Sequence, residues 1–305
     1  MVTRYNTFKR VIVQYWLLYL MLLPGIIYYL VFRFLPMAGL VMAFQDYKLV
    51  GGIFASPWVG FKYFDEIFTG PFFGRILFNS FYISFLKLLF GYPAPIILAL
   101  MLNEVRRSWF KKLVQTITYL PNFLSWVIIY GMVLILLSPS TGLVNEVIKA
   151  QGADPINFLT DKTWFIVVLV ASSVWAYAGY SAVIYLAALS NISPELYEAA
   201  TIDGASRMQQ VWYVSLPGIR NVMMVLLILS MGSILDAGFA QIYIFYNPQV
   251  YQVSDIIDTW VFRNGVEQLQ ISLSTAMGFF RSVVGLVMIV GANWTAKKVT
   301  GSGLW

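Results

Sequence analysis

The sequence has no cysteine and no histidine among its 305 residues. Without cysteine it can form neither disulfide bonds nor thiolate metal sites. Without histidine it lacks imidazole ligands and a side chain that titrates near neutral pH as a general base. These two absences exclude most kinds of catalytic site.

Charged residues are also scarce, because they make up 11% of the chain whereas a soluble domain carries about a quarter. Hydrophobic residues account for 59% and aromatic residues for 17%. Such a composition is typical of a membrane protein, in which Trp and Tyr concentrate at the level of the headgroups. The net charge of +6 does not indicate nucleic-acid binding, because the basic residues form short clusters between apolar runs.

Six apolar stretches are long enough to cross a membrane, whose hydrocarbon core of about 30 Å needs roughly 20 helical residues. We therefore expect an all-α membrane protein with one transmembrane domain over residues 1–305. Its spans are expected at about 15–35, 76–102, 113–137, 164–189, 222–245 and 276–295. The first stretch is too long for a signal peptide and has no small-residue cleavage site, so we expect it to remain as an anchor.

The basic residues between the spans predict the orientation of the chain, because cytoplasmic segments carry an excess of Lys and Arg. If the N-terminus is cytoplasmic, the outer segments hold seven basic residues and nine acidic ones. The inner segments then hold eleven basic residues, namely Arg4, Lys9, Arg10, Arg106, Arg107, Lys111, Lys112, Arg207, Arg220, Lys297 and Lys298. Both termini are accordingly expected in the cytoplasm.

The segment 191–217, between the fourth and fifth spans, carries well-defined helix signals. Ser193 is a good N-cap and Pro194 suits the first helical position, so a helix is expected to begin there. Asp203 and Gly204 supply a turn, after which Ser206 can cap a second short helix. This cytoplasmic helix-turn-helix has an apolar face with few charges, which indicates either a protein partner or an amphipathic helix resting on lipid.

The pattern within this segment resembles the EAA loop of ABC importer permeases. It consists of Glu198-Ala199-Ala200, Gly204, and then Val214, Leu216 and Pro217, with Val214 where isoleucine is commoner. The fuller string from Leu196 to Ser206 is similar to the carbohydrate-uptake branch of these permeases. Other strings resemble permeases for oligosaccharides from alginate and pectin: Ser56–Gly60, Pro93–Pro95, Gln115–Pro121 and Gly303–Trp305.

The resemblance implies a type I ABC importer permease fold with six transmembrane helices and a coupling helix that docks into a groove on an ATPase subunit. It implies that the coupling residues are Glu198, Ala199, Ala200, Asp203, Gly204, Leu216 and Pro217. The chain would be a multi-pass permease in the inner membrane of a bacterium, forming half of the pathway for an oligosaccharide. It would bind no cofactor or metal and no nucleic acid, and would not itself be an enzyme.

The partners implied by the resemblance are a second homologous permease subunit, two ATPase subunits that use ATP and Mg, and an extracellular binding protein. The second permease is usually a distinct chain in this subgroup, and a homodimer stays open. The sequence has no Walker-type phosphate loop, so energy is expected to arrive through the coupling loop.

Hydroxyl and aromatic residues on the fourth and fifth spans are candidates for the sugar path, because sugars need aromatic surfaces and hydrogen-bonding groups. Helical spacing places most of the candidates on the fourth span along one side of it. By resemblance to the maltose permease, four of the positions match sugar-contacting ones. The candidates are Ser173, Tyr177, Tyr180, Ser181 and Ser230, with Asp236 as a hypothesis. Equally, such residues can make hydrogen bonds between packed helices.

Three ionisable residues lie inside the expected spans, namely Lys87, Asp236 and Arg281. They should face protein or water, because a charge in lipid costs a few kcal/mol. Asp236 can pair with either basic residue, or Arg281 can extend to the outer interface.

Two other classes of protein fit the composition less well. An ion-gradient-driven secondary transporter would show an internal repeat, which we do not find. A membrane enzyme would need clustered acids, for which Asp255 and Asp258 are the nearest candidates.

Overall fold

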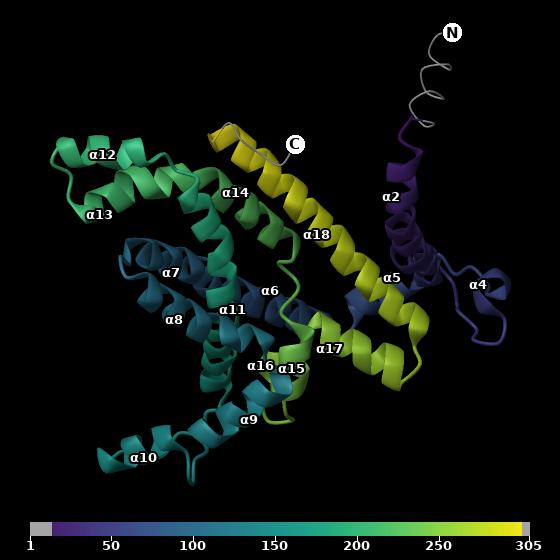
Figure 1. Ribbon diagram of the computed structural model, residues 1–305. Coiled ribbons are helices and arrows are strands. Elements are labelled where there is room, and N and C mark those ends of the chain that lie inside the picture. The colour runs from purple at the N-terminus through teal and green to yellow at the C-terminus, as the bar shows by residue number, and fades with distance from the viewer. Residues whose placement is uncertain (1–13, 301–305) are drawn as a thin grey trace. The chain divides into compact units, whose positions relative to one another are not determined.

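The computed structural model describes residues 14–300 as a helical protein (Figure 1). Arg4, Lys9 and Arg10, which contributed to the expected orientation, lie outside the described residues, as does the string Gly303–Trp305. Within the described range the only extended pairing is an isolated bridge between Gln45 and Trp58. The expected all-α class is confirmed.

Helices of membrane-spanning length and hydropathy occur five times in the described range: Trp16–Phe44, Phe73–Glu104, Lys162–Ser190, Arg207–Gly232 and Ile271–Lys298. A sixth span results if the pair Ser108–Phe123 and Trp126–Leu137, bent by 106°, is taken as one. The chain divides into two compact units. The smaller unit comprises residues 1–68 and 264–279, and the larger unit comprises residues 69–263 and 280–305.

The smaller unit contains the first span and the loop that follows it. Its elements are α2 (Trp16–Tyr29), η1 (Leu30–Phe34), α3 (Leu35–Met37), η2 (Ala38–Phe44), α4 (Gly52–Ala55), most of α5 (Lys62–Thr69) and the start of α18 (Ile271–Thr300). The Phe44 ring contacts the rings of Phe61, Phe64 and Phe279 at centroid distances of 5.3–5.6 Å. These aromatic contacts hold the loop against α18.

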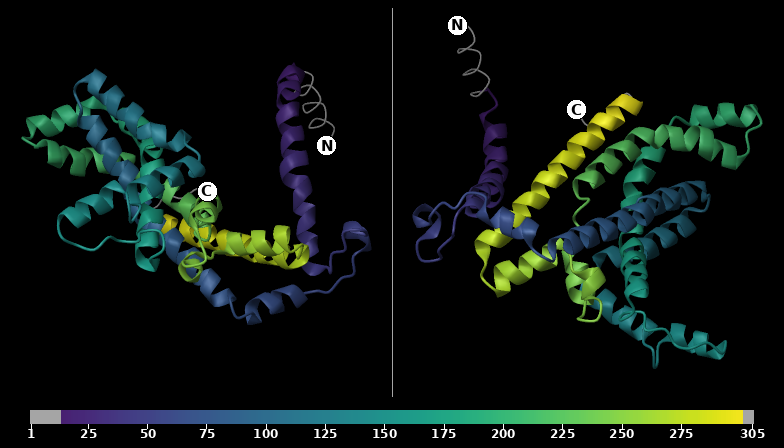
Figure 2. Two further views of the ribbon diagram at one scale, coloured as in Figure 1. Left: turned by 90° about the horizontal axis from the view of Figure 1, so that it is seen from below. Right: turned by 180° about the vertical axis from the view of Figure 1, so that it is seen from behind.

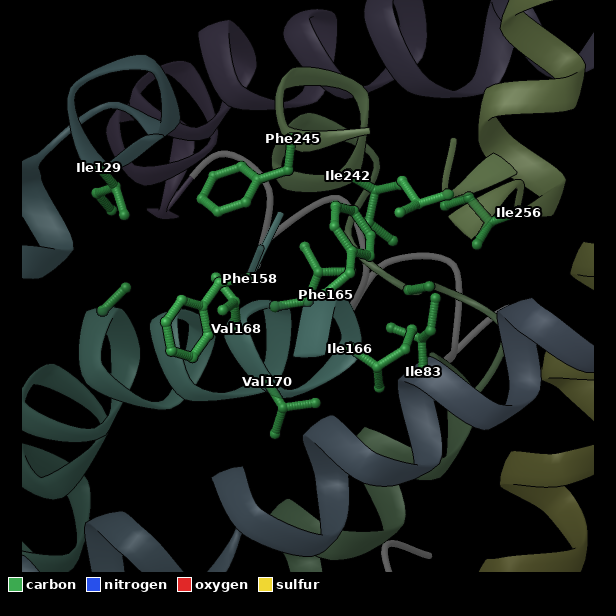
Figure 3. Packing of buried hydrophobic residues seen from close by; sticks show 14 residues of the cluster. Ile83, Ile129, Phe158, Phe165, Ile166, Val168, Val170, Ile242, Phe245 and Ile256 are labelled. Carbon is green, nitrogen blue, oxygen red and sulfur yellow. The ribbon is translucent and has the colours of Figure 1, made fainter. Parts of the chain in front are cut away.

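The larger unit is built around α11 (Lys162–Ser190), which packs against α6 (Phe73–Gly91), α7 (Pro93–Glu104), α8 (Ser108–Tyr119) and α14 (Leu216–Gly232). Its main core includes the fully buried Phe165 and Phe245 (Figure 3). The remaining helical elements of this unit are η3 (Leu120–Phe123), α9 (Trp126–Leu137), α10 (Leu143–Ala150), α12 (Pro194–Ile202), α13 (Arg207–Gln210), η4 (Val211–Ser215), α15 (Phe239–Phe245), α16 (Tyr251–Ser254), α17 (Ile257–Phe262) and most of α18. Most of η5 (Arg263–Glu267) belongs to the smaller unit.

Local signals explain the position of α11. The carboxylate of Asp161 accepts hydrogen bonds from the backbone N–H groups of Thr163 and Trp164, both at 2.9 Å, and so caps the helix. Farther along, Gly179 lets α8 approach closely, because a Cβ at this position would lie 1.9 Å from the carbonyl oxygen of Thr118. This packing contact therefore requires glycine.

Two of the expected spans differ from the helices observed. The span expected at 222–245 is interrupted, because α14 ends at Gly232 and α15 begins at Phe239. Gly238, directly before α15, has a φ of +87°, and its N–H donates to Asp236 Oδ1 at 3.1 Å. The span expected at 113–137 is broken after Phe123, where Ser125 caps a new helix.

Candidate functional site

The segment that was expected to couple to an ATPase forms a helical hairpin in the larger unit, in which α12 and α13 fold back on each other (Figure 1, and from two further sides in Figure 2). Pro194 opens α12 as expected, although Ser193 makes no capping hydrogen bond. Gly204 turns the chain with a φ of +79°. Ser206 then caps α13 in a reciprocal capping box with Gln209.

The hairpin presents an exposed apolar surface. Glu198, Ala199, Asp203, Gly204 and Pro217 are exposed, whereas Ala200 and Leu216 are half-buried. Around them lie large side chains with exposed fractions between 55% and 86%, namely Leu196, Ile202, Met208, Trp212 and Tyr213. An apolar surface of this kind indicates a contact with another protein or a membrane.

Two internal contacts, which the sequence did not reveal, fix the hairpin to the start of α14. The hydroxyl groups of Tyr197 and the fully buried Ser215 share a hydrogen bond of 2.9 Å. In addition, Ile192 packs on Gly218 so tightly that a Cβ there would lie 2.5 Å from Ile192 Cδ1. Both contacts join residues about 20 positions apart or more, so no local pattern points to them.

A cavity of about 610 Å³ lies in the larger unit between α6, α7, α11 and α14. This volume is within the range of roughly 300–1,000 Å³ that is usual for ligand pockets. Aromatic side chains, including Tyr92, Tyr177 and Tyr185, form part of its wall. Its polar lining further comprises Ser84, Lys87, Ser173, Ser181, Ser230, Ser233 and Asp236.

Five of the six path candidates line this cavity: Ser173, Tyr177, Ser181, Ser230 and Asp236. The sixth, Tyr180, lies on a different face of α11, where its ring contacts that of Phe123 at 6.1 Å. The Ser230 hydroxyl donates to the carbonyl of Leu226 in its own helix at 2.8 Å. The structure therefore brings together candidate residues from the fourth and fifth expected spans around one space.

The charged residues of the spans make defined contacts. Arg281 forms an ion pair with Asp236 at 2.9 Å and a second one with Asp258, so it does not extend away from the protein. Asp236 thus pairs with Arg281, which was one of the two alternatives left by the sequence. The Nζ of Lys87 instead donates to the carbonyl of Ala237 at 2.6 Å and to Gln241 Oε1.

Asp255 and Asp258, the acids considered as candidates for an enzyme site, each form an ion pair with an arginine. Asp255 accepts two hydrogen bonds from Arg263, at 2.8 and 3.2 Å. Burial raises the pKa of Asp258, while its ion pair with Arg281 acts in the opposite direction. No group of three or more acidic side chains in residues 14–300 is arranged to hold a metal ion.

Comparisons with known proteins agree with the sequence pattern. Residues 91–301 match a family described as the binding-protein-dependent transport system inner membrane component. Two proteins of Bacillus subtilis (strain 168) are similar. Protein LplB is 44% identical over 94% of this chain and 91% of its own length. The polygalacturonan/rhamnogalacturonan transport system permease protein YteP is 46% identical over 96% of this chain and 92% of its own.

Two solved structures are also similar to this chain, each with 42% identity and a TM-score of 0.88. One is a bacterial ABC transporter involved in the import of the acidic polysaccharide alginate, matched over 96% of this chain and 99% of that one. The other is a bacterial alginate ABC transporter in complex with an alginate pentasaccharide-bound periplasmic protein, matched over 97% and 99%. The expected type I importer permease fold is confirmed.

Proposed function

Because the chain belongs to the family of binding-protein-dependent transport system inner membrane components, we propose that it forms half of the path through which an ATP-driven importer passes an oligosaccharide. The resemblance found in the EAA pattern is confirmed by this family membership. As a multi-pass permease component the chain is a transport subunit rather than an enzyme. The cavity whose polar lining comes from three spans is the observation that carries the proposal.

The substrate class follows from the relatives and from the lining of the cavity. Tyr177 offers a ring surface for a sugar, and Ser173 and Ser181 offer hydroxyl groups beside it. Similar chains belong to transporters of polygalacturonan/rhamnogalacturonan and of alginate. An acidic oligosaccharide is therefore the substrate that we propose.

The hairpin of residues 191–217 would transmit the energy of ATP hydrolysis. Its exposed apolar residues, such as Trp212 and Tyr213, suit a groove on a protein better than a lipid surface, because Arg207 is the only basic residue between Asn191 and Pro217. Glu198 would be its most exposed contact with the ATPase, and Gly204 would permit close approach. Ala199, Ala200, Asp203, Leu216 and Pro217 complete the coupling residues.

The working assembly would contain a second related permease, two ATPase subunits that use ATP and Mg, and an extracellular binding protein. A solved relative bound to a periplasmic protein supports the last of these partners. Six spans in one domain provide half of a pathway, so a second permease is needed. The family match supports a bacterial inner-membrane location. The distribution of basic residues supports both termini in the cytoplasm.

The test of this function is the ATPase activity of the complete complex reconstituted in vesicles, with binding protein and oligogalacturonate added. We expect Glu198→Ala and Gly204→Asp to abolish most of the stimulated hydrolysis, because they alter the proposed ATPase contact and the turn. Glu146→Ala is a matched control, since this exposed carboxylate lies on α10, outside the hairpin. Stimulation that survives both changes, together with uptake driven by an ion gradient without ATP, would favour a secondary transporter.

A further inference from the structure

The wall of the cavity formed by α6 carries two polar side chains whose hydrogen-bonding capacity the protein does not use up. Ser84 and Lys87 are three residues apart, so they lie on the same face of the helix. Both line the cavity of about 610 Å³. A hydroxyl group and an ammonium group therefore lie near each other in this wall of the cavity.

Ser84 is buried but unpaired. The residue is 6% exposed, and its hydroxyl oxygen has no hydrogen-bond partner among the described residues. One turn earlier on the same helix, the hydroxyl of Ser80 donates to the carbonyl of Ile76 at 2.8 Å and accepts from the N–H of Ile257. A buried hydroxyl without a hydrogen-bond partner is unfavourable. A ligand that bonds to the Ser84 hydroxyl would remove this cost.

Lys87 also has a free donor. An ammonium group has three N–H bonds, and the structure accounts for two of them, to the carbonyl of Ala237 and to Gln241 Oε1. Both acceptors are neutral, and none of the ion pairs in the described part of the chain involves this lysine. Its charge is therefore without a direct counterion.

The neighbouring carboxylate of Asp236 is already engaged. One of its oxygens pairs with Arg281 at 2.9 Å, and the other accepts from the N–H of Gly238 at 3.1 Å. Its charge is thereby paired with that of Arg281. The unsatisfied groups of this wall are thus a hydroxyl donor and a positive charge.

A carboxylate fits these two groups, because its two oxygens accept hydrogen bonds from a hydroxyl and an ammonium at once. We propose that Ser84 and Lys87 form a carboxylate-binding subsite that takes a uronate residue of an acidic oligosaccharide. This inference rests on the proposed function, of which it specifies the substrate. If Lys87 only held Ala237 and Gln241 in place, the unpaired hydroxyl of Ser84 would have no explanation.

The experiment measures binding of two labelled sugars to the purified complete transporter complex without its binding protein. The sugars are oligogalacturonate and the same oligosaccharide with its carboxyl groups reduced to alcohols. Ser84→Ala and Lys87→Met are expected to weaken binding of the charged sugar roughly 10-fold or more and to leave that of the reduced sugar within about 2-fold. Lys87→Arg should retain the preference for the charged sugar.

Ser233→Ala is the matched control, because Ser233 lines the same cavity away from α6 and should affect both sugars equally. Ser84→Ala removes a hydroxyl that makes no hydrogen bond within the described part of the chain, so this variant should fold even if Lys87→Met does not. Equal weakening for both sugars, or none, would overturn the subsite. Stimulated ATPase activity that still depends on Glu198 would then show that the importer function stands without it.

Discussion

The guanidinium group of Arg281 forms ion pairs with two carboxylates that come from different elements of the larger unit. Asp236 comes from the break after α14, and Asp258 comes from α17. One oxygen of Asp258 has no hydrogen-bond partner, so the site has no spare donor to replace the arginine. Removing Arg281 would therefore leave two negative charges close together without compensation.

We expect Arg281→Met to destabilise the larger unit by about 2 kcal/mol. The cost stays below the roughly 3–5 kcal/mol of a fully buried pair, because the Asp236 side chain is 47% exposed. Thermal unfolding of the purified complex measures the effect, with Arg220→Met on exposed α14 surface as the control. Asp258→Asn in the Arg281→Met background should recover part of the loss. An unchanged unfolding temperature would contradict the role assigned to Arg281.

At the scale of elements, the hairpin and α14 behave as one piece because hydrogen bonds join them. Besides the bond between Tyr197 and Ser215, the side-chain amide of Gln210 donates to the hydroxyl of Thr201 at 2.9 Å. The first bond connects α12 to the last residue of η4, directly before α14, and the second connects α13 to α12. Because of these bonds, a displacement of the hairpin would also displace α14.

We expect Tyr197→Phe and Ser215→Ala each to lower sugar-stimulated ATPase activity several-fold while leaving basal hydrolysis unchanged. Each removes one hydrogen bond worth about 1 kcal/mol. Because both act on the same bond, the double variant should be no worse than the single ones. Tyr19→Phe is the matched control, since this exposed tyrosine lies on α2, outside the hairpin. Additive losses would show that the two side chains act separately.

The sequence predicted those elements whose signals are local. Pro194, Gly204 and Ser206 define the ends of α12 and α13 through backbone preferences that operate within a few residues. By contrast, the break in the fifth span lies beside Lys87, which donates to Ala237 although the two residues are 150 positions apart. Hydropathy cannot reveal such a break, because residues on both sides of it are apolar.

The candidate site was predictable to a similar extent. Spacing on the fourth span pointed to Ser173, Tyr177 and Ser181, which line the cavity, and also to Tyr180, which does not. The contribution of Ser84 was not visible, because serines on a membrane helix usually bond to their own backbone. The absence of a hydrogen bond at Ser84 depends on how the helices pack, which a single helix sequence does not encode.

At the scale of the whole molecule, the absence of cysteine offers a direct test of orientation. In right-side-out vesicles we expect a membrane-impermeant maleimide to label Asp154→Cys, which is exposed between α10 and α11, but not Met208→Cys in the hairpin. After permeabilisation of the vesicles, both variants should be labelled. The unaltered chain should not be labelled before or after permeabilisation. The reverse pattern would place the hairpin outside and would contradict the coupling proposal.

α14 begins at Leu216, directly after the hairpin, and ends at Gly232, just beyond the cavity-lining Ser230. From Leu216 to Ser230 the helix is about 21 Å long. Near its start, the fully buried Ile219 packs in a cluster with Leu189 and Tyr185 of α11. If an ATPase moves the hairpin as proposed, the contact at Ile219 would act as a pivot near the start of α14. A small tilt of the hairpin would then produce a larger displacement of Ser230 at the cavity.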